Sequence, residues 1–151
     1  MAICCFNITT IASFFAEELT MFHGSCLCGA VKYTILLEQL DDITLCHCHK
    51  CQKASGSAFN AVTPVAAEFM QIQDEQGMLK HFESSPGVER NFCGQCGSPV
   101  FSFRPALQQY RVRIGSLDDS VNIKPVQHIY YAYRAPWLII NDIAPKYPEG
   151  L

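Results

Sequence analysis

Residues 46–51 read CHCHKC, a stretch in which Cys46, Cys48 and Cys51 fall within six positions. Two further cysteine groups stand on either side of it, CLC at residues 26–28 and CGQC at residues 93–96. Tetrahedral zinc binds thiolate sulfur at about 2.3 Å, so its ligands lie close together, which short spacings interrupted by turns achieve. The spacing therefore favours metal ligation over disulfide bonds, and we expect the fold to be organised around these groups.

The other two cysteines, Cys4 and Cys5, bring the total to nine, an odd number that excludes complete pairing. A chain of 151 residues with 49% hydrophobic content also builds a core without disulfide staples. Cysteines that act only as small buried hydrophobic residues are not expected to cluster beside glycines. The CGQC stretch at residues 93–96 could also be a redox motif, but such a motif needs a βαβ context, whereas a strand is expected after Cys96. With a net charge of −3 and scattered basic residues, the chain offers no patch for nucleic acid.

Residues 1–20 lack Lys and Arg and contain no apolar run long enough to span a bilayer. We therefore expect no targeting signal there and no membrane association. Met21 begins the segment MFHGSCLCG, which contains the first cysteine group, and we therefore hypothesise that the native protein begins at Met21. Residues 1–20 would then be an N-terminal extension, with Cys4 and Cys5 outside the functional part, and residues 21–151 a single zinc-binding domain.

From residue 30 onward the hydrophobic period is mostly two, as in the run from Val31 to Leu37. Similar runs, bounded by Gly, Pro, Ser or Asp, predict strands at residues 43–45, 58–65, 78–82, 88–92, 99–103, 110–114 and 128–133. A short helix is expected after Cys48, over residues 50–55, with Gly56 ending it, and residues 66–71 are expected to form another turn. The fold class predicted is all-β, with mainly antiparallel sheets and short helical turns.

The seven clustered cysteines divide naturally between two metal sites. A structural zinc site is closed by four protein ligands, whereas a catalytic site keeps three and leaves one position open. The expected structural ligands are Cys26, Cys28, Cys93 and Cys96, and the expected catalytic ligands are Cys46, Cys48 and Cys51. One alternative stays open: His47 or His49 could close the second site as a Cys₃His structural centre.

Three segments carry a resemblance to a known family: GSCLCG at residues 24–29, CHCHKC at residues 46–51 followed by Ser55 and Gly56, and RNFCGQCGS at residues 90–98. Together with PVQHI at residues 125–129 and APW at residues 135–137, they resemble the glutathione-dependent formaldehyde-activating enzyme family. Its domain is shared with centromere protein V. The similarity covers about residues 21–148.

The resemblance implies an Mss4-like fold of the β-tent kind, clasped by two Zn²⁺ per chain, and the same division of the cysteines into four and three. It also implies a carbon–sulfur lyase activity like that of S-(hydroxymethyl)glutathione synthase, with glutathione and formaldehyde as substrates. The expected partners are thus a small glutathione-like thiol and an aldehyde.

A zinc ion with three thiolates and an open position can hold a substrate thiol as its thiolate, the form that attacks an aldehyde carbon. The proton for the resulting alkoxide could come from His47, His49 or His128, none of which the spacing singles out. Basic residues could also bind the carboxylates of the substrate, although any one of these residues is more often simply exposed to solvent. The candidates are Arg90, Arg111, Arg113, Lys50 and Lys53.

Two interpretations without catalysis also stay open, namely a zinc-binding interaction module of Mss4-like fold and a thiol redox sensor. Free thiolates that have not yet bound zinc persist best in a reducing compartment, so the expected location is the cytoplasm. The later aromatic residues are expected to fill the core or to line the face of a homodimer. They are Phe101, Phe103, Tyr130, Tyr131, Tyr133 and Trp137.

Overall fold

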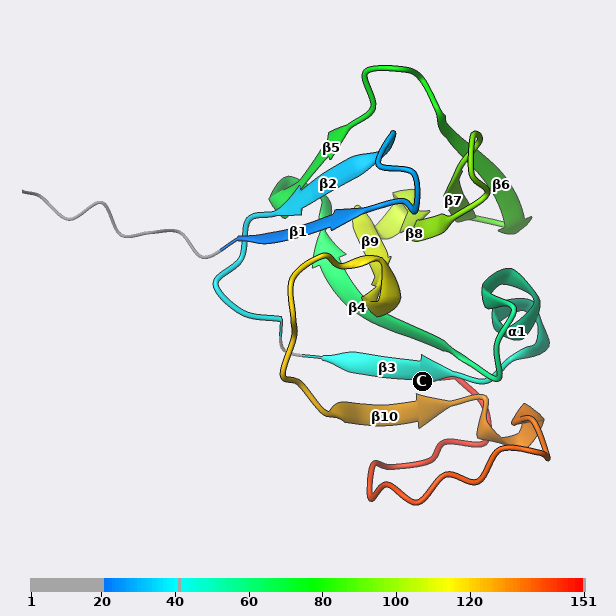
Figure 1. The fold of residues 1–151 in the computed structure, drawn as a ribbon. Coiled ribbons are helices and arrows are strands. Elements are labelled where there is room, and N and C mark those ends of the chain that lie inside the picture. The colour runs from blue at the N-terminus through cyan, green and yellow to red at the C-terminus, as the bar shows by residue number, and fades with distance from the viewer. Residues whose placement is uncertain (1–20, 41, 151) are drawn as a thin grey trace, which may run out of the picture.

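The computed structural model describes residues 21–40 and 42–150 and contains two β-sheets (Figure 1). The smaller sheet has the strand order β1 (Phe22–Ser25), β2 (Lys32–Ile35), β5 (Met70–Gln73). The larger sheet has the order β10 (Pro125–Ile129), β3 (Ile43–Cys46), β4 (Asn60–Ala66), β9 (Gln109–Arg113), β8 (Pro99–Arg104), β7 (Val88–Cys93), β6 (Leu79–Ser85). The pairings are antiparallel except that of β10 with β3. The all-β prediction is therefore confirmed, while the predictions for residues 1–20 lie outside the described residues.

Helix α1 (His49–Ser55) confirms the short helix predicted after Cys48. Cys48 is its N-cap, and its sulfur accepts a hydrogen bond from the Cys51 N–H. Gly56 ends the helix with a φ of 62°, a left-handed conformation that costs glycine little. Short 3₁₀ helices form at Ala67–Phe69, Pro105–Leu107, Ile114–Ser116 and Tyr131–Tyr133. None of the helices in the described ranges combines the length and hydropathy needed to cross a bilayer.

The strand prediction for residues 128–133 is wrong over its second half. Strand β10 ends at Ile129 because Tyr130 takes a left-handed conformation with a φ of 55°, after which the chain turns into a 3₁₀ helix. The turn expected at residues 66–71 forms only as far as Phe69, since Met70 begins strand β5. Strand β1 was not predicted, because its four residues are too few to reveal a period.

The larger sheet has one apolar face and one polar face. Thr63, Val112 and Phe101 lie side by side across β4, β9 and β8, and all three are buried in or beside the core. The smaller sheet covers this face, with Tyr33 packed edge-on against Phe101 at 5.8 Å between ring centroids. Because side chains alternate along a strand, the neighbouring row, which includes Arg111, points to the opposite face. That opposite face carries the polar residues described below.

Gly24 lies opposite Tyr33 in the register of β1 and β2, and it permits the tyrosine ring to cross the strand. A Cβ at residue 24 would overlap the ring of Tyr33, which is 1% exposed and held by a 2.7 Å hydrogen bond to Ser116 Oγ. We expect Gly24→Ala to lower the free energy of unfolding by about 2–3 kcal/mol, measured by denaturant titration. Gly115→Ala adds a methyl group with no atom within 4 Å and is the control, with an expected change below about 0.5 kcal/mol. Equal stability of the two variants would contradict this account.

Candidate active site

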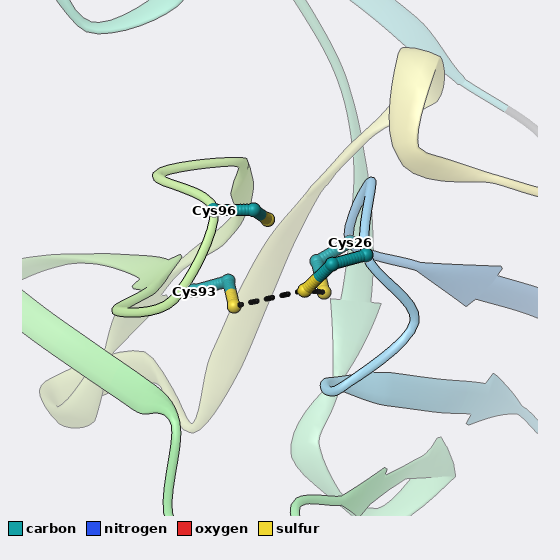
Figure 2. Close-up of side chains that lie close together, drawn as sticks. Cys26, Cys93 and Cys96 are labelled. Carbon is teal, nitrogen blue, oxygen red and sulfur yellow. Dashed lines mark hydrogen bonds between the residues drawn. The ribbon is translucent and has the colours of Figure 1, made fainter.

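Four cysteine thiols from two distant loops converge at one end of the core (Figure 2). Cys26 and Cys28 lie in the loop between β1 and β2, whereas Cys93 ends β7 and Cys96 lies in the turn before β8. The sulfur atoms of Cys26 and Cys28 are 3.5 Å apart, and those of Cys28 and Cys93 are 3.8 Å apart. All four sulfurs lie within 4.8 Å of one another, so the structure brings together the four cysteines that the sequence groups as one site.

Both loops of this cluster are shaped by backbone hydrogen bonds around a glycine. The Gly29 N–H donates to the Cys26 carbonyl over 2.9 Å, and the Gly97 N–H donates to the Cys93 carbonyl over 2.8 Å. Gly29 has a φ of 76° and Gly97 a φ of 75°, values that glycine adopts without steric cost. These tight turns aim the two thiols of each loop at the same point.

The second cluster is built by the junction of β3 with α1. Cys46 is the last residue of β3, Cys48 caps the helix and Cys51 lies in its first turn. The Cys46 and Cys48 sulfurs are 3.6 Å apart, and the Cys51 N–H points at the Cys48 sulfur over 3.4 Å. All three sulfurs lie within 4.8 Å of one another.

Both clusters could hold a metal ion. A disulfide would bring two sulfurs to about 2.05 Å, whereas the measured separations of 3.5–3.8 Å match the roughly 3.8 Å edge of a ZnS₄ tetrahedron with 2.3 Å bonds. No histidine nitrogen joins either group in the described ranges, which argues against the Cys₃His alternative. The donor sets are thus four thiols in one cluster and three in the other.

The three-thiol cluster borders a basic side chain that favours its ionised form. The hydrogen bond with the Cys46 thiol lowers the pKa of Cys51, and the Arg90 guanidinium, 3.7 Å from the Cys51 sulfur, acts in the same direction. The same contact with Cys51 raises the pKa of Cys46, and burial adds to that rise. Since metals bind thiolates, Arg90 compensates part of the negative charge that three thiolates bring together.

The three-thiol cluster opens into a cavity of about 590 Å³. The floor of this cavity is the polar face of the larger sheet, all seven strands of which contribute residues, and the start of α1 forms one wall. Representative floor residues are Thr44, Cys46, Asn60, Ser102, Arg111 and Gln127. The four-thiol cluster does not border this cavity, and of its cysteines Cys26 lines a separate hollow of about 580 Å³. All three cysteines of the second cluster line the basic cavity.

Among the residues that the structure describes, the cavity lining is basic and contains no Asp or Glu. Three of the candidate basic residues, Lys50, Arg90 and Arg111, do line it. Arg113 instead donates to Asn60 Oδ1 over 2.8 Å in the sheet, and Lys53 is not part of the lining. Arg104 on β8 also lines the cavity but was missed, because the strand predicted there ended at residue 103. A strand extended by one residue would have placed Arg104 on the same face as Ser102, because side chains two positions apart in a strand point the same way.

The histidines separate into a buried pair and a cavity residue. His47 and His128 are both 0% exposed, and their ring nitrogens lie 2.9 Å apart. His128 reaches the Asp142 carboxylate over 2.9 Å with its other nitrogen. Burial lowers the pKa of His47 to about 4, and His128 and Arg134 act in the same direction. His49, in contrast, lines the cavity beside Tyr133.

A hydrogen-bonded chain from the exposed Asp142 through the buried His128 to the buried His47 braces the loop that carries Cys46 and Cys48. The His47 N–H also donates to the Ile129 carbonyl over 3.0 Å, so both backbone and side chain hold this loop against β10. Asp142 was not among the sequence candidates, since a single carboxylate in an irregular segment carries no spacing signal.

The sequence model of a family described as "Glutathione-dependent formaldehyde-activating enzyme" matches residues 21–133. A Halomonas elongata protein named "Putative glutathione-dependent formaldehyde-activating enzyme" is 27% identical over 130 residues, which are 81% of this chain and 82% of that protein. A Schizosaccharomyces pombe protein named as an uncharacterized lyase is 28% identical over 80 residues, which are 53% and 56% of the two chains. The crystal structure of a Rhodobacter sphaeroides protein matches with a TM-score of 0.54 and 19% identity, covering 66% of this chain and 91% of that one. This last likeness is one of fold alone.

Proposed function

Since the chain belongs to the glutathione-dependent formaldehyde-activating enzyme family, we propose that it is a zinc-dependent carbon–sulfur lyase-type enzyme that handles thiol–aldehyde adducts. The reaction would resemble that of an S-(hydroxymethyl)glutathione synthase, with a glutathione-like thiol adding to formaldehyde or a related aldehyde. The observation that carries this proposal is the opening of the three-thiol cluster into the basic cavity. The names of two relatives, a formaldehyde-activating enzyme and a lyase, support the same class of reaction.

We assign two Zn²⁺ ions per chain to the two clusters. The structural ion would be held by Cys26, Cys28, Cys93 and Cys96, and the catalytic ion by Cys46, Cys48 and Cys51. A zinc ion with three protein ligands keeps one position open and stabilises a substrate thiol in its thiolate form. The absence of a fourth protein ligand among the described residues supports this division.

The cavity contributes proximity and orientation. Its volume of about 590 Å³ suits a small-molecule thiol together with an aldehyde, since ligand sites commonly span about 300–1,000 Å³. Holding the two reactants side by side replaces a bimolecular encounter by a local one. In the addition, the thiolate sulfur forms a bond to the carbonyl carbon, and the carbonyl oxygen becomes an alkoxide that takes up a proton.

We assign the delivery of that proton to His49. Of the three histidine candidates, His49 is the one that lines the cavity, at the first position of α1. His47 and His128 are fully buried and hydrogen-bonded to one another, so their nitrogens do not reach the cavity. A histidine within reach of the alkoxide is a suitable general acid near neutral pH.

We further propose that residues 21–151 form a single domain and that the protein acts in the cytoplasm. The family match over residues 21–133 supports one domain. The seven cysteines of the described ranges are all free thiols, which a reducing compartment preserves.

Metal analysis combined with a thiol titration tests the proposed function. We expect two zinc ions per chain, of which one changes its spectrum on glutathione binding after Co²⁺ substitution. With formaldehyde present, the enzyme is expected to speed formation of the hydroxymethyl adduct, followed by NMR, by about 100-fold or more over the spontaneous reaction. Two metal ions whose spectra do not change on addition of glutathione, together with no acceleration of adduct formation, would favour an interaction module instead. Zinc loss under mild peroxide without acceleration would favour a redox sensor.

A further inference from the structure

Two guanidinium groups on the cavity floor have no hydrogen-bond partner among the residues that the structure describes. Arg104 on β8 and Arg111 on β9 are both half-buried, and the Nε atom of each is buried without a hydrogen-bond partner. A buried donor left without an acceptor costs free energy, so native structures rarely retain one without a reason. Both residues line the cavity, where a ligand can reach the guanidinium groups.

The same two arginines lie close to each other on paired strands, and no carboxylate of the described residues neutralises them. Neither forms an ion pair within 4.0 Å in residues 21–40 and 42–150, and no acidic residue lines the cavity. Burial lowers the pKa of Arg111, and the positive charge of Arg104 lowers it further, while Asp42 opposes the shift only from a distance. Two adjacent half-buried positive charges are unfavourable in the empty cavity and become favourable when an anion binds between them.

The other two basic residues of the cavity are already engaged. Arg90 donates to Ser84 Oγ over 2.8 Å and lies against the Cys51 sulfur, and Lys50 donates to the Ser84 carbonyl over 3.0 Å. These residues serve the cluster and the neighbouring strand. Arg104 and Arg111 are therefore the groups that remain for a ligand.

The sheet register gives the separation between this pair and the thiol cluster. Cys46 pairs with Asn60, and Arg111 pairs with Pro64 on the same strand β4. Two strand spacings and four residues along the strand place the Cα atoms of Cys46 and Arg111 roughly 16 Å apart. A ligand of three extended residues spans about 10 Å. The side chains of Cys46 and Arg111 would bridge the rest of the distance.

We propose that Arg104 and Arg111 form a carboxylate subsite that selects thiols of tripeptide size, with a terminal carboxylate held by the arginine pair while the sulfur lies at the three-cysteine cluster. A guanidinium fork matches the two oxygens of a carboxylate, which gives both affinity and orientation. The subsite rests on the proposed function for the role of the sulfur, and it explains how a small cavity would distinguish a peptide thiol from free cysteine.

The test uses S-methylglutathione, which keeps both carboxylates but has no free thiol, with the zinc-loaded protein. Calorimetric titration is expected to give a dissociation constant that rises about 10-fold or more in Arg104→Gln and in Arg111→Gln. Lys124→Gln, which removes an exposed positive charge outside the cavity lining, is the matched control and is expected to bind like the wild type. S-methylglutathione diethyl ester, with both carboxylates masked, should bind the wild-type protein at least about 10-fold more weakly than the free acid.

The ester comparison needs no variant, so it remains informative if an arginine substitution impairs folding. Failure of the wild type to bind S-methylglutathione, equal binding of acid and ester, or wild-type binding by both folded arginine variants would overturn the subsite. Because this ligand cannot supply a thiol, binding that depends on the arginines in a protein without adduct formation would refute the proposed function and leave the subsite standing.

Discussion

Cys48→Ser is expected to lose one of the two zinc ions and to slow adduct formation by about 100-fold or more while the chain stays folded. Cys48 caps α1, and its sulfur accepts the Cys51 N–H over 3.4 Å. Serine is a favoured N-cap residue, so its hydroxyl can take over this hydrogen bond and preserve the helix. A neutral hydroxyl, however, is a poor substitute for a thiolate ligand of zinc. The substitution therefore removes the chemistry of the cluster and spares the local structure.

The measurements are the zinc content of the purified variant, its circular dichroism spectrum and its rate of adduct formation. Cys4→Ser serves as the control, since Cys4 belongs to none of the three cysteine groups in the sequence, and we expect it to keep both metal ions and the full rate. A Cys48→Ser protein with unchanged turnover would refute the proposed role of the cluster.

Cys93→Ser is expected to have the largest effect on stability. Cys93 is 0% exposed, belongs to the core and joins β7 to the four-thiol cluster. Structural zinc contributes about 10 kcal/mol or more of binding free energy in small domains, whereas a whole domain is stable by only about 5–15 kcal/mol. Losing even half of the metal's contribution would lower the melting temperature by about 15 °C, and losing all of it would unfold the chain.

Thermal unfolding of the soluble fraction, together with zinc analysis, measures this effect. Cys48→Ser is the matched comparison, because it also replaces a cysteine ligand by serine but in the cluster that borders the cavity. We expect its melting temperature to fall far less. A Cys93→Ser protein as stable as Cys48→Ser would mean that the four-thiol cluster does not hold the two loops together.

Local signals in the sequence were sufficient for some elements of the fold. Helix α1 was predicted after Cys48 with Gly56 at its end, because a left-handed glycine acts within one turn of the helix. The role of Cys48 as the N-cap was not predicted. The end of β10 was not predicted, because Tyr130 and the aromatic residues after it continue the apolar run while the backbone turns away. Side-chain type alone does not reveal such a change of backbone conformation.

The candidate site likewise has a part that local sequence predicted and a part that depends on strand pairing. The grouping of Cys46, Cys48 and Cys51 is a local property, because six residues span at most about 20 Å even when extended, so that one strand-to-helix turn is enough to bring their thiols together. The basic subsite is a property of strand pairing, since Arg104 and Arg111 become neighbours only when β8 and β9 pair. Asp142 likewise meets His128, which lies 14 positions earlier in the sequence, only because the chain folds back on β10.

The sequence by itself therefore determined the all-β class, the short helix and the grouping of the clustered cysteines into four and three. The strand pattern, the helix and each short cysteine motif depend on residues a few positions apart, where covalent geometry limits the possible arrangements. The combination of Cys26 and Cys28 with Cys93 and Cys96 followed from the four ligands that a structural zinc site needs. Only the tertiary structure decided which cluster borders the basic cavity, which histidine lines that cavity and which arginines lack a hydrogen-bond partner among the described residues. Alternation along a strand predicts which residues share a face of the sheet. Which strands pair, and which layer covers each face, is set by packing between residues far apart in the sequence.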